Sequence, residues 1–259
     1  MRRPRAPERG WLGRHGHRHR HDVHGGGAVP RGPQNLIFDA DDTLWECTVL
    51  FERAIETFVD YVDHPTLSRA EVRAALTEVE RENTAAHGYG ARVFERSLGD
   101  CLARLRPGRP VDAADRAFLG RLCAALVEGE LVLLEGALET LHTLRRRHRL
   151  YLLTKGDPEY QRAKIAASGM EPLFAGVGIV REKDPAAYES FGRDHGLDPG
   201  ATWMIGNSVR SDILPALEAG MGAVLVPHPA TWVLEHAEPP AGHARFREVD
   251  PIGRLVEIF

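Results

Sequence analysis

The sequence predicts an α/β fold: a Rossmann-like parallel sheet core with helices on both faces, plus an all-helical cap domain. Two patterns predict it. After residue 136, short apolar runs alternate with helical segments, which is typical of a parallel sheet. Between residues 46 and 133, apolar residues recur at helical spacing without a convincing strand. We therefore expect a core from residues 34–45 and 134–259, and a helical cap from residues 46–133.

Each predicted element follows from its apolar pattern. Residues 36–38 form a short buried strand, and Phe51, Ile55 and Phe58 mark the first cap helix. Further cap helices are expected around 72–79 and at 112–128. In the second half, helices at 137–147, 158–168, 185–195 and 211–219 alternate with strands at 149–153, 176–180, 201–205 and 223–226. Ligands of such sheets bind at the carboxyl ends of the strands, so functional residues are expected there.

Composition indicates a globular protein of moderate size. The 259 residues, 43% apolar and 27% charged, are enough for one sizeable core with a smaller accessory unit. No apolar run approaches the roughly 20 residues of a membrane span, and the basic first segment lacks a secretory signal's apolar stretch. Three cysteines without metal-ligand spacing predict free thiols. We therefore expect a cytoplasmic protein without a membrane partner.

Charge is distributed unevenly along the chain. Residues 1–35 contain eight arginines against Glu8 and Asp22, a local charge of +6, and the remainder carries −10. An acidic body argues against nucleic-acid binding, which depends on a basic face. Residues 1–33 are rich in Arg, His, Gly and Pro and have no apolar period, so we expect a disordered extension. Its closely spaced histidines alternate with arginines, which disfavours a metal site there.

Three carboxylates follow the first predicted strand within four residues, at Asp39, Asp41 and Asp42. Residues two apart in an extended segment leave on the same face, so Asp39 and Asp41 can converge. Like charges at the end of a buried strand are costly unless a cation shares the site. The stretch therefore predicts a divalent metal site. A solvated acidic turn is the alternative, although the sequence returns to Leu44 and Trp45 at once.

The later strand ends also carry polar residues. Thr154 and Lys155 follow the strand at 149–153, just before an Asp-Pro helix start whose amides suit a phosphoryl oxygen. Lys183 precedes a second Asp-Pro pair, and Asn207 and Asp212 follow the strand at 201–205. Taken singly, these junctions are also explained as helix caps. Lysine is rare, with three against 30 arginines, which favours specific roles for the lysines at 155, 164 and 183.

In this order, the strand ends resemble the four motifs of the haloacid-dehalogenase (HAD) superfamily, over about residues 34–227. The segment 39–43 is similar to the first motif, Asp-x-Asp-x-Thr, and Thr154 and Lys183 to the second and third. The fourth motif is usually Gly-Asp with a second Asp, and here Asn207 replaces its first Asp. Asparagine keeps an oxygen for the metal or its water but removes one negative charge.

The resemblance implies a magnesium-dependent phosphatase acting on a small phosphorylated metabolite. Asp39 would attack phosphorus and form an aspartyl-phosphate. Asp41 would protonate the leaving oxygen and then deprotonate the attacking water, which needs a carboxyl pKa above that of free aspartate. Lys183 and Thr154 would offset the charge of the phosphoryl group. Mg²⁺ would be held by Asp39, the carbonyl of Asp41, Asp212 and waters, one of them positioned by Asn207.

Substrate choice is expected to depend on the cap. The turn at residues 87–90 interrupts the helical pattern, and we predict that Tyr89 and Arg92 reach over the site and contact the leaving group, as Thr154 and Lys155 contact the phosphate. An ordinary turn between helices is the alternative. A phosphomutase acting on a sugar phosphate and a non-catalytic protein that binds a phosphorylated ligand also stay open. So do the substrate and the oligomeric state, monomer or homodimer.

Overall fold

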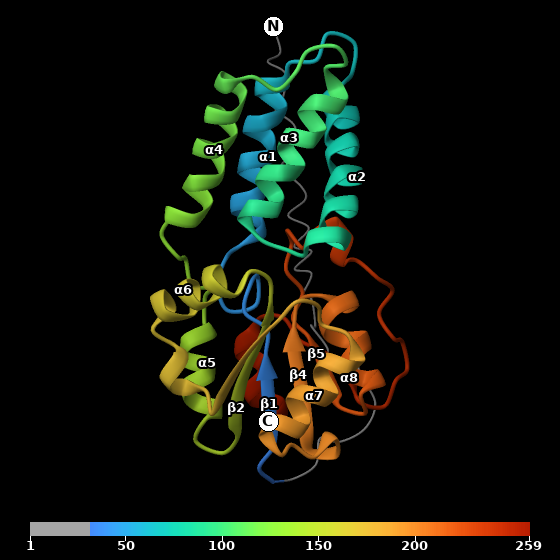
Figure 1. Ribbon diagram of the computed structural model, residues 1–259. Helices are drawn as coiled ribbons and strands as arrows, with labels where there is room; N and C mark the ends of the chain where they lie inside the picture. The colour runs from blue at the N-terminus through green and yellow to red at the C-terminus, as the bar shows by residue number, and fades with distance from the viewer. Residues whose placement is uncertain (1–31) are drawn as a thin grey trace, which may run out of the picture.

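The computed structural model describes residues 32–259 and shows a sheet domain with a bundle of helices above it (Figure 1). The predicted extension at 1–33 lies almost wholly outside the described residues. Among the residues that are described, no helix is long and apolar enough to cross a membrane. Asp157 and Asp184 cap their helices as predicted, accepting from the amides of Tyr160 at 3.0 Å and Ala187 at 2.8 Å.

The sheet is entirely parallel and has the strand order β3-β2-β1-β4-β5-β6. Its strands are β1 (Asn35–Phe38), β2 (Arg149–Lys155), β3 (Gly176–Val180), β4 (Thr202–Gly206), β5 (Gly222–Leu225) and β6 (Phe246–Glu248). The central strand β1 pairs with β2 and β4, and Phe38 lies level with Leu152 and Ile205. The chain leaving β1 therefore emerges between the segments that follow β2 and β4, which brings three of the predicted motifs to one edge.

Helices cover both faces of the sheet, as the alternation in β1 requires. Leu36 and Phe38 pack in one buried cluster and Ile37 in another, because successive side chains of a strand point to opposite faces. The helices of this domain are α5 (Ala137–Leu144), α6 (Pro158–Ser168), α7 (Pro185–His195), α8 (Leu214–Glu218) and α9 (Leu255–Ile258). The first cluster includes residues of α5, α6 and α9, and the second includes residues of α7 and α8. The predicted fold class is confirmed.

The helical cap consists of α1 (Thr48–Val62), α2 (Arg69–His87), α3 (Ala91–Leu105) and α4 (Ala113–Glu128). These helices have a buried cluster of their own, which contains Phe58, Leu76 and Leu98. Capping boxes start α2 at Ser68 and α4 at Asp112. The cap joins the sheet domain through two neighbouring segments: the amide of Glu46 donates to Val132 at 2.9 Å, and that of Leu134 to Leu44 at 3.0 Å.

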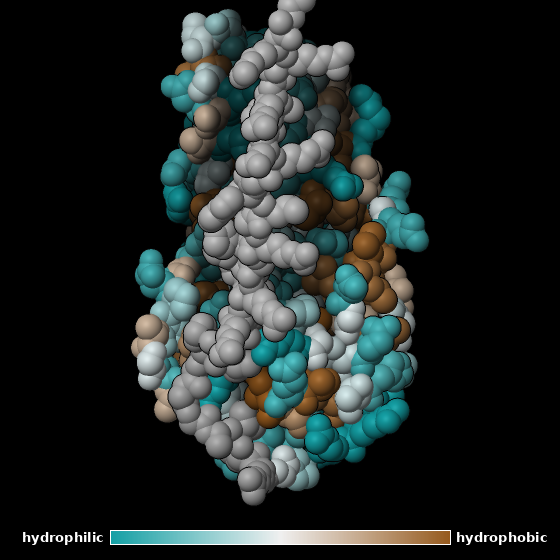
Figure 2. Space-filling model, turned by 180° about the vertical axis from the view of Figure 1, so that it is seen from behind, coloured by the Kyte–Doolittle hydropathy of each residue, from teal (hydrophilic) through white to brown (hydrophobic). Residues whose placement is uncertain are grey.

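Two elements differ from the sequence-based expectation. The helix expected at 211–219 is divided into a π-helical turn, Val209–Ile213, and the short α8. Strand β6 was not expected, because the segment between β5 and β6 lacks a regular apolar period. From behind, hydrophobic residues gather where the cap meets the sheet domain (Figure 2). Exposed large apolar side chains include Val127, Val132 and Leu133, at the end of α4 and on the segment leading to α5.

Candidate active site

A cavity of about 180 Å³ lies between the cap and the carboxyl ends of the central strands. Its core side contains Asp39 and Asp41 after β1, Thr154 near the end of β2, Lys183 after β3 and Asp212 after β4. Its cap side is lined by residues of α1, α2 and α3. Five residues from four different strand ends therefore meet at one place, as the predicted sheet requires.

Asp39, Lys183 and Asp212 form the buried floor of this cavity. The Lys183 ammonium makes a short contact with Asp39 Oδ1 and donates to Asp212 Oδ1 at 2.8 Å. Thr43 Oγ1 donates to the other oxygen of Asp39 at 3.0 Å. Burial raises the pKa of Asp39 to about 7; Lys183 opposes this shift, and the negative charge of Asp212 adds to it. One ammonium thus leaves the two carboxylates incompletely neutralised.

The position of Asp212 depends on Gly206 and on the π-helical turn. The amide of Ser208 donates to Asp212 Oδ2 at 2.9 Å. A Cβ atom at position 206 would lie 2.2 Å from the same oxygen, so any other residue would displace the carboxylate. Asn207 is also oriented: its amide nitrogen donates to Thr231 at 3.2 Å, and its oxygen accepts from Thr43 at 3.4 Å.

This donor set fits Mg²⁺. Two carboxylates and an amide oxygen are ligands that a hard divalent cation prefers, and the single ammonium of Lys183 lies between the two carboxylates. Elsewhere in the described structure, Asp42, Glu46 and His228 offer ligand atoms within 4.8 Å of one another. However, Asp42 already accepts from the amides of Cys47 at 2.8 Å and Thr48 at 3.0 Å. Asp42 therefore shapes the turn into α1.

Asp41 lies in an unexpected environment. Lys164 contacts both of its oxygens, at 2.5 and 2.6 Å, Gln161 donates to it at 3.0 Å, and the Trp45 indole donates at 2.7 Å. Burial tends to raise its pKa, but the charge and hydrogen bonds of Lys164, with Gln161 and Trp45, outweigh burial, so the pKa is lowered. Partial burial was expected to raise it. The sequence singled out Lys164 for its rarity but did not indicate its partner.

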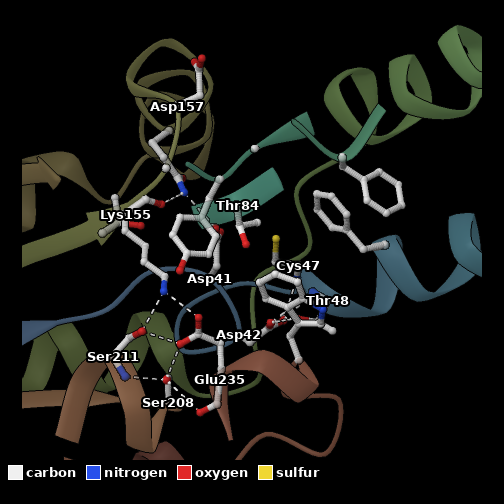
Figure 3. A pocket seen from close by; sticks show the side chains of 18 of the residues that line it. Asp41, Asp42, Cys47, Thr48, Thr84, Lys155, Asp157, Ser208, Ser211 and Glu235 are labelled. Carbon is white, nitrogen blue, oxygen red and sulfur yellow. Dashed lines mark hydrogen bonds and ion pairs between the residues drawn. The ribbon is translucent and has the colours of Figure 1, made fainter. Parts of the chain in front are cut away.

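Lys155 is enclosed by partners rather than free to meet a phosphate. Its ammonium donates to Glu235 at 2.6 Å and to Ser211 at 2.8 Å (Figure 3), and also to Glu182 at 3.2 Å. Glu235 also accepts from Ser208 at 2.6 Å. Glu235 was missed from the sequence because it lies in a segment without apolar periodicity. Thr154, by contrast, is buried and lines the cavity as predicted.

The cap turn places Tyr89 and Arg92 differently. Tyr89 lines the cavity, donates to Glu182 at 2.7 Å and lies 4.0 Å from the Lys155 ammonium. The glycines on both sides have positive φ, 84° and 129°, which lets this turn approach the sheet domain. Arg92 does not line the cavity: its side chain is 79% exposed and pairs with Glu159 at 3.3 Å. The structure thus brings only Tyr89 to the site.

A family model described as haloacid dehalogenase-like hydrolase matches residues 34–220. The chain belongs to this family. Within it, human N-acylneuraminate-9-phosphatase is 35% identical over 208 residues, which are 73% of this chain and 80% of the human protein. The mouse enzyme of the same name is 25% identical over 211 residues, with the same coverage of each chain. The family predicted from the strand-end motifs is therefore confirmed, and the chain is a HAD-type phosphoric monoester hydrolase.

Solved structures agree with this assignment. A haloacid dehalogenase-like family hydrolase from Xanthomonas campestris superposes with a TM-score of 0.73 at 27% identity, covering 87% of this chain and 93% of that one. The HAD-hydrolase YfnB from Bacillus subtilis, solved with bound magnesium, gives a TM-score of 0.63 at 20% identity, covering 88% and 99%. The latter likeness supports the fold alone.

Proposed function

We propose that this HAD hydrolase is a magnesium-dependent phosphatase that cleaves a small phosphomonoester through an aspartyl-phosphate on Asp39. One observation carries the proposal: Asp39 and Asp212 converge on the buried Lys183 at the floor of a cavity that a cap covers. Such a site offers an oxygen nucleophile and positive charge for phosphoryl oxygens, the two requirements of phosphoryl transfer.

In the first step, a carboxylate oxygen of Asp39 attacks phosphorus while the bond from phosphorus to the leaving oxygen breaks. The leaving oxygen takes a proton from the Asp41 carboxyl, which becomes a carboxylate. Lys183 and the Thr154 hydroxyl stabilise the oxygens of the transferring group. Because Lys164 holds Asp41 as a carboxylate, Asp41 must separate from Lys164, at least in part, to carry the proton.

In the second step, the Asp41 carboxylate takes a proton from water, whose oxygen attacks phosphorus. The bond from phosphorus to Asp39 breaks, which releases inorganic phosphate and restores the Asp39 carboxylate. The observed pairing with Lys164 suits this step, since it keeps Asp41 ionised. Lys164 therefore favours the base role of Asp41 over its acid role.

Mg²⁺ held by Asp39, the Asp41 carbonyl, Asp212 and Asn207, directly or through water, would offset charge on the phosphoryl group. The residues themselves support this assignment. Without a cation, Asp39 has the raised pKa and Asp41 the lowered one, so the proton lies on the nucleophile rather than on the acid. A cation held beside Asp39 would lower the pKa of Asp39 and so favour the carboxylate that attacks phosphorus.

The names of the relatives suggest a sugar-acid phosphate as one candidate substrate. A phosphomutase would use the same floor residues and differ in recapturing the phosphoryl group, and a binding protein would lack turnover. We also propose a cytoplasmic location: Cys47, Cys101 and Cys123 are free thiols in the described structure, as a reducing compartment allows, and cell fractionation tests it.

Release of phosphate from p-nitrophenyl phosphate, measured with Mg²⁺ and with a chelator, tests the function. We expect magnesium-dependent turnover that Asp39→Asn lowers by at least about 1,000-fold, because the nucleophile is lost. The matched control is Asp184→Asn, which changes a cap of α7 outside the cavity. Turnover by Asp39→Asn at the wild-type rate would contradict the mechanism. An isomeric sugar phosphate as product would identify a mutase, and no turnover on a broad panel would identify a binder.

A further inference from the structure

The cap side of the cavity contains a buried acid without a hydrogen-bond partner. Glu80 of α2 is 6% exposed and lines the same cavity as Asp39. No described residue donates a hydrogen bond to its carboxyl group. Burial raises its pKa to about 7; the charge of Glu52 adds to the shift and Arg73 opposes it. The carboxyl oxygens are not enclosed by protein but face the cavity, so a ligand in that space can supply the donor that the protein does not.

Apolar side chains form the wall beside Glu80. Phe51 and Phe94 meet edge to face, with ring centroids 5.0 Å apart. Ile55 and Val93 extend this wall, and Thr84, one turn from Glu80 on α2, lies at the cavity (Figure 3). A ligand group in this half therefore meets a mainly apolar surface, on which Glu52 contacts Arg73 and Glu80 has no ion-pair partner among the described residues.

No free cation balances Glu80 within the cavity. Among its described lining residues, the cations are Lys155, Lys164 and Lys183, all from the sheet domain. Each already contacts at least one carboxylate of that domain. A carboxylate on a leaving group would thus face Glu80 without an unpaired positive partner, which is unfavourable in a partly desolvated site.

The cavity also has room beyond Glu80. A neighbouring cavity of about 390 Å³ shares Glu52, Ile55, Glu80 and Trp232 with it and extends along the segment 229–233. Arg73 lines this second space but contacts Glu52 and pairs with Glu56 at 2.5 Å. Glu80 therefore lies between the two spaces, where a leaving group that fills both must pass it.

We propose that the cap half of the cavity selects a leaving group that has an apolar face, carries no carboxylate and presents a hydroxyl or ammonium donor to Glu80. This inference rests on the proposed function, because it describes the alcohol released from the phosphomonoester. It separates this chain from relatives named for N-acylneuraminate 9-phosphate, whose leaving group is a carboxylic acid. Glu80 is a specificity residue that touches the substrate far from the reacting phosphorus.

Binding tests this inference apart from turnover. Esters are titrated calorimetrically, with Mg²⁺, into Asp39→Asn protein, which leaves them intact. Sorbitol 6-phosphate and 6-phosphogluconate differ only in a terminal carboxylate, and N-acetylmannosamine 6-phosphate lacks the three-carbon carboxylate unit of N-acetylneuraminate 9-phosphate. We expect the ester without a carboxylate to bind at least about tenfold tighter in each pair. Glucosamine 6-phosphate tests the ammonium, and p-nitrophenyl phosphate, without a donor, serves as reference.

Adding Glu80→Leu should weaken the uncharged and ammonium esters by about 10- to 100-fold, the effect of losing a hydrogen bond to a charged group. Binding of p-nitrophenyl phosphate should change by less than about twofold. Glu80→Gln keeps an acceptor oxygen, so its binding of these esters should lie between that of the Asp39→Asn parent and that of Glu80→Leu. Glu78→Gln, at an exposed position on the same helix, should leave binding unchanged. Thermal unfolding of each variant checks folding, and Glu80→Gln alone decides if Glu80→Leu does not fold.

Tighter binding of the carboxylated esters overturns the inference, and so does equal weakening of every ester by Glu80→Leu, which would make Glu80 structural. Failure to bind any ester overturns it as well. The proposed function fails on a different result, the absence of magnesium-dependent phosphate release by the wild-type protein. Binding as expected without turnover would therefore keep the inference on ligand chemistry and reject the phosphatase.

Discussion

The two halves of the cavity are built in opposite ways. On the core half, Asp39, Lys183 and Asp212 follow strands whose register fixes them, and each charge has a partner. On the cap half, helices supply an apolar wall and Glu80 without a partner. The groups that break the bond are thus held by the backbone of the sheet, whereas the groups that select the leaving group lie on helices that can change independently.

Apart from loss of the nucleophile itself, the largest effect is expected from Gly206→Ala on the core half. The added Cβ would lie 2.2 Å from Asp212 Oδ2, so the carboxylate must move. A displacement of this size at a catalytic group costs about 100-fold, and we expect at least that loss in kcat/KM together with weaker Mg²⁺ binding. Gly253→Ala is the control, since its nearest neighbour would be Thr140 at 4.0 Å. A loss within about threefold would show that the position of Asp212 is not critical.

Lys164→Met should change the leaving-group dependence. Without Lys164 the pKa of Asp41 rises, because burial then acts with less opposition, and Asp41 carries its proton more often. Alkyl esters need that proton more than p-nitrophenyl phosphate does. We expect the ratio of kcat/KM for alkyl over aryl esters to rise about tenfold. Lys164→Arg keeps the charge and should keep the ratio; an equal loss on both esters would indicate a purely structural lysine.

Both halves should make stability depend on pH, but only the contribution of the core half should respond to Mg²⁺. Burial raises the pKa of Asp39 from 3.8 and that of Glu80 from 4.5, each to about 7. Between the unfolded and the folded pKa values the folded protein holds more protons than the unfolded chain, so the metal-free protein loses stability as pH rises from about 4 to about 7. Mg²⁺ should remove the contribution of Asp39 to this pH dependence, and Glu80→Gln should remove the contribution of Glu80. Melting temperatures at several pH values, with chelator or Mg²⁺, measure this; a flat profile in chelator would contradict it.

The smallest effects concern the cap turn. Tyr89→Ala removes the contacts with Glu182 and Lys155, and we expect kcat/KM to fall by about 3- to 10-fold. Arg92→Ala should change it by less than about twofold, because exposed ion pairs contribute little. Steady-state kinetics on one alkyl ester compares the variants directly. If Arg92→Ala has the larger effect, the cap turn adopts a different position during turnover.

More of the core half than of the cap half could be predicted from the sequence. The strand ends at Asp39, Lys183 and Asp212 were predictable, since a parallel sheet gathers such residues at one edge. The helix starts at Asp157 and Asp184 were predictable from Asp-Pro. These signals are local in the chain, so they survive without any knowledge of tertiary packing.

The cap half depends on packing that no local pattern shows. Helical periodicity identified Leu76 and Val79 as apolar residues of α2, but it did not indicate that Glu80 beside them turns toward the cavity. The contact between Lys164 and Asp41 joins residues far apart in the chain and was missed for the same reason. Strand β6 and Glu235 lie where the sequence has no regular period.

The junction at Trp45 and Leu133 has a consequence for how such enzymes diversify. The two segments that leave the sheet domain pair side by side there, so everything between them begins and ends at nearly the same point. A helical insert of different length or sequence can replace the cap between these two segments without changing the distance between its two attachment points. New substrates can then be acquired by replacing a self-contained segment, while the machinery beneath it is inherited intact.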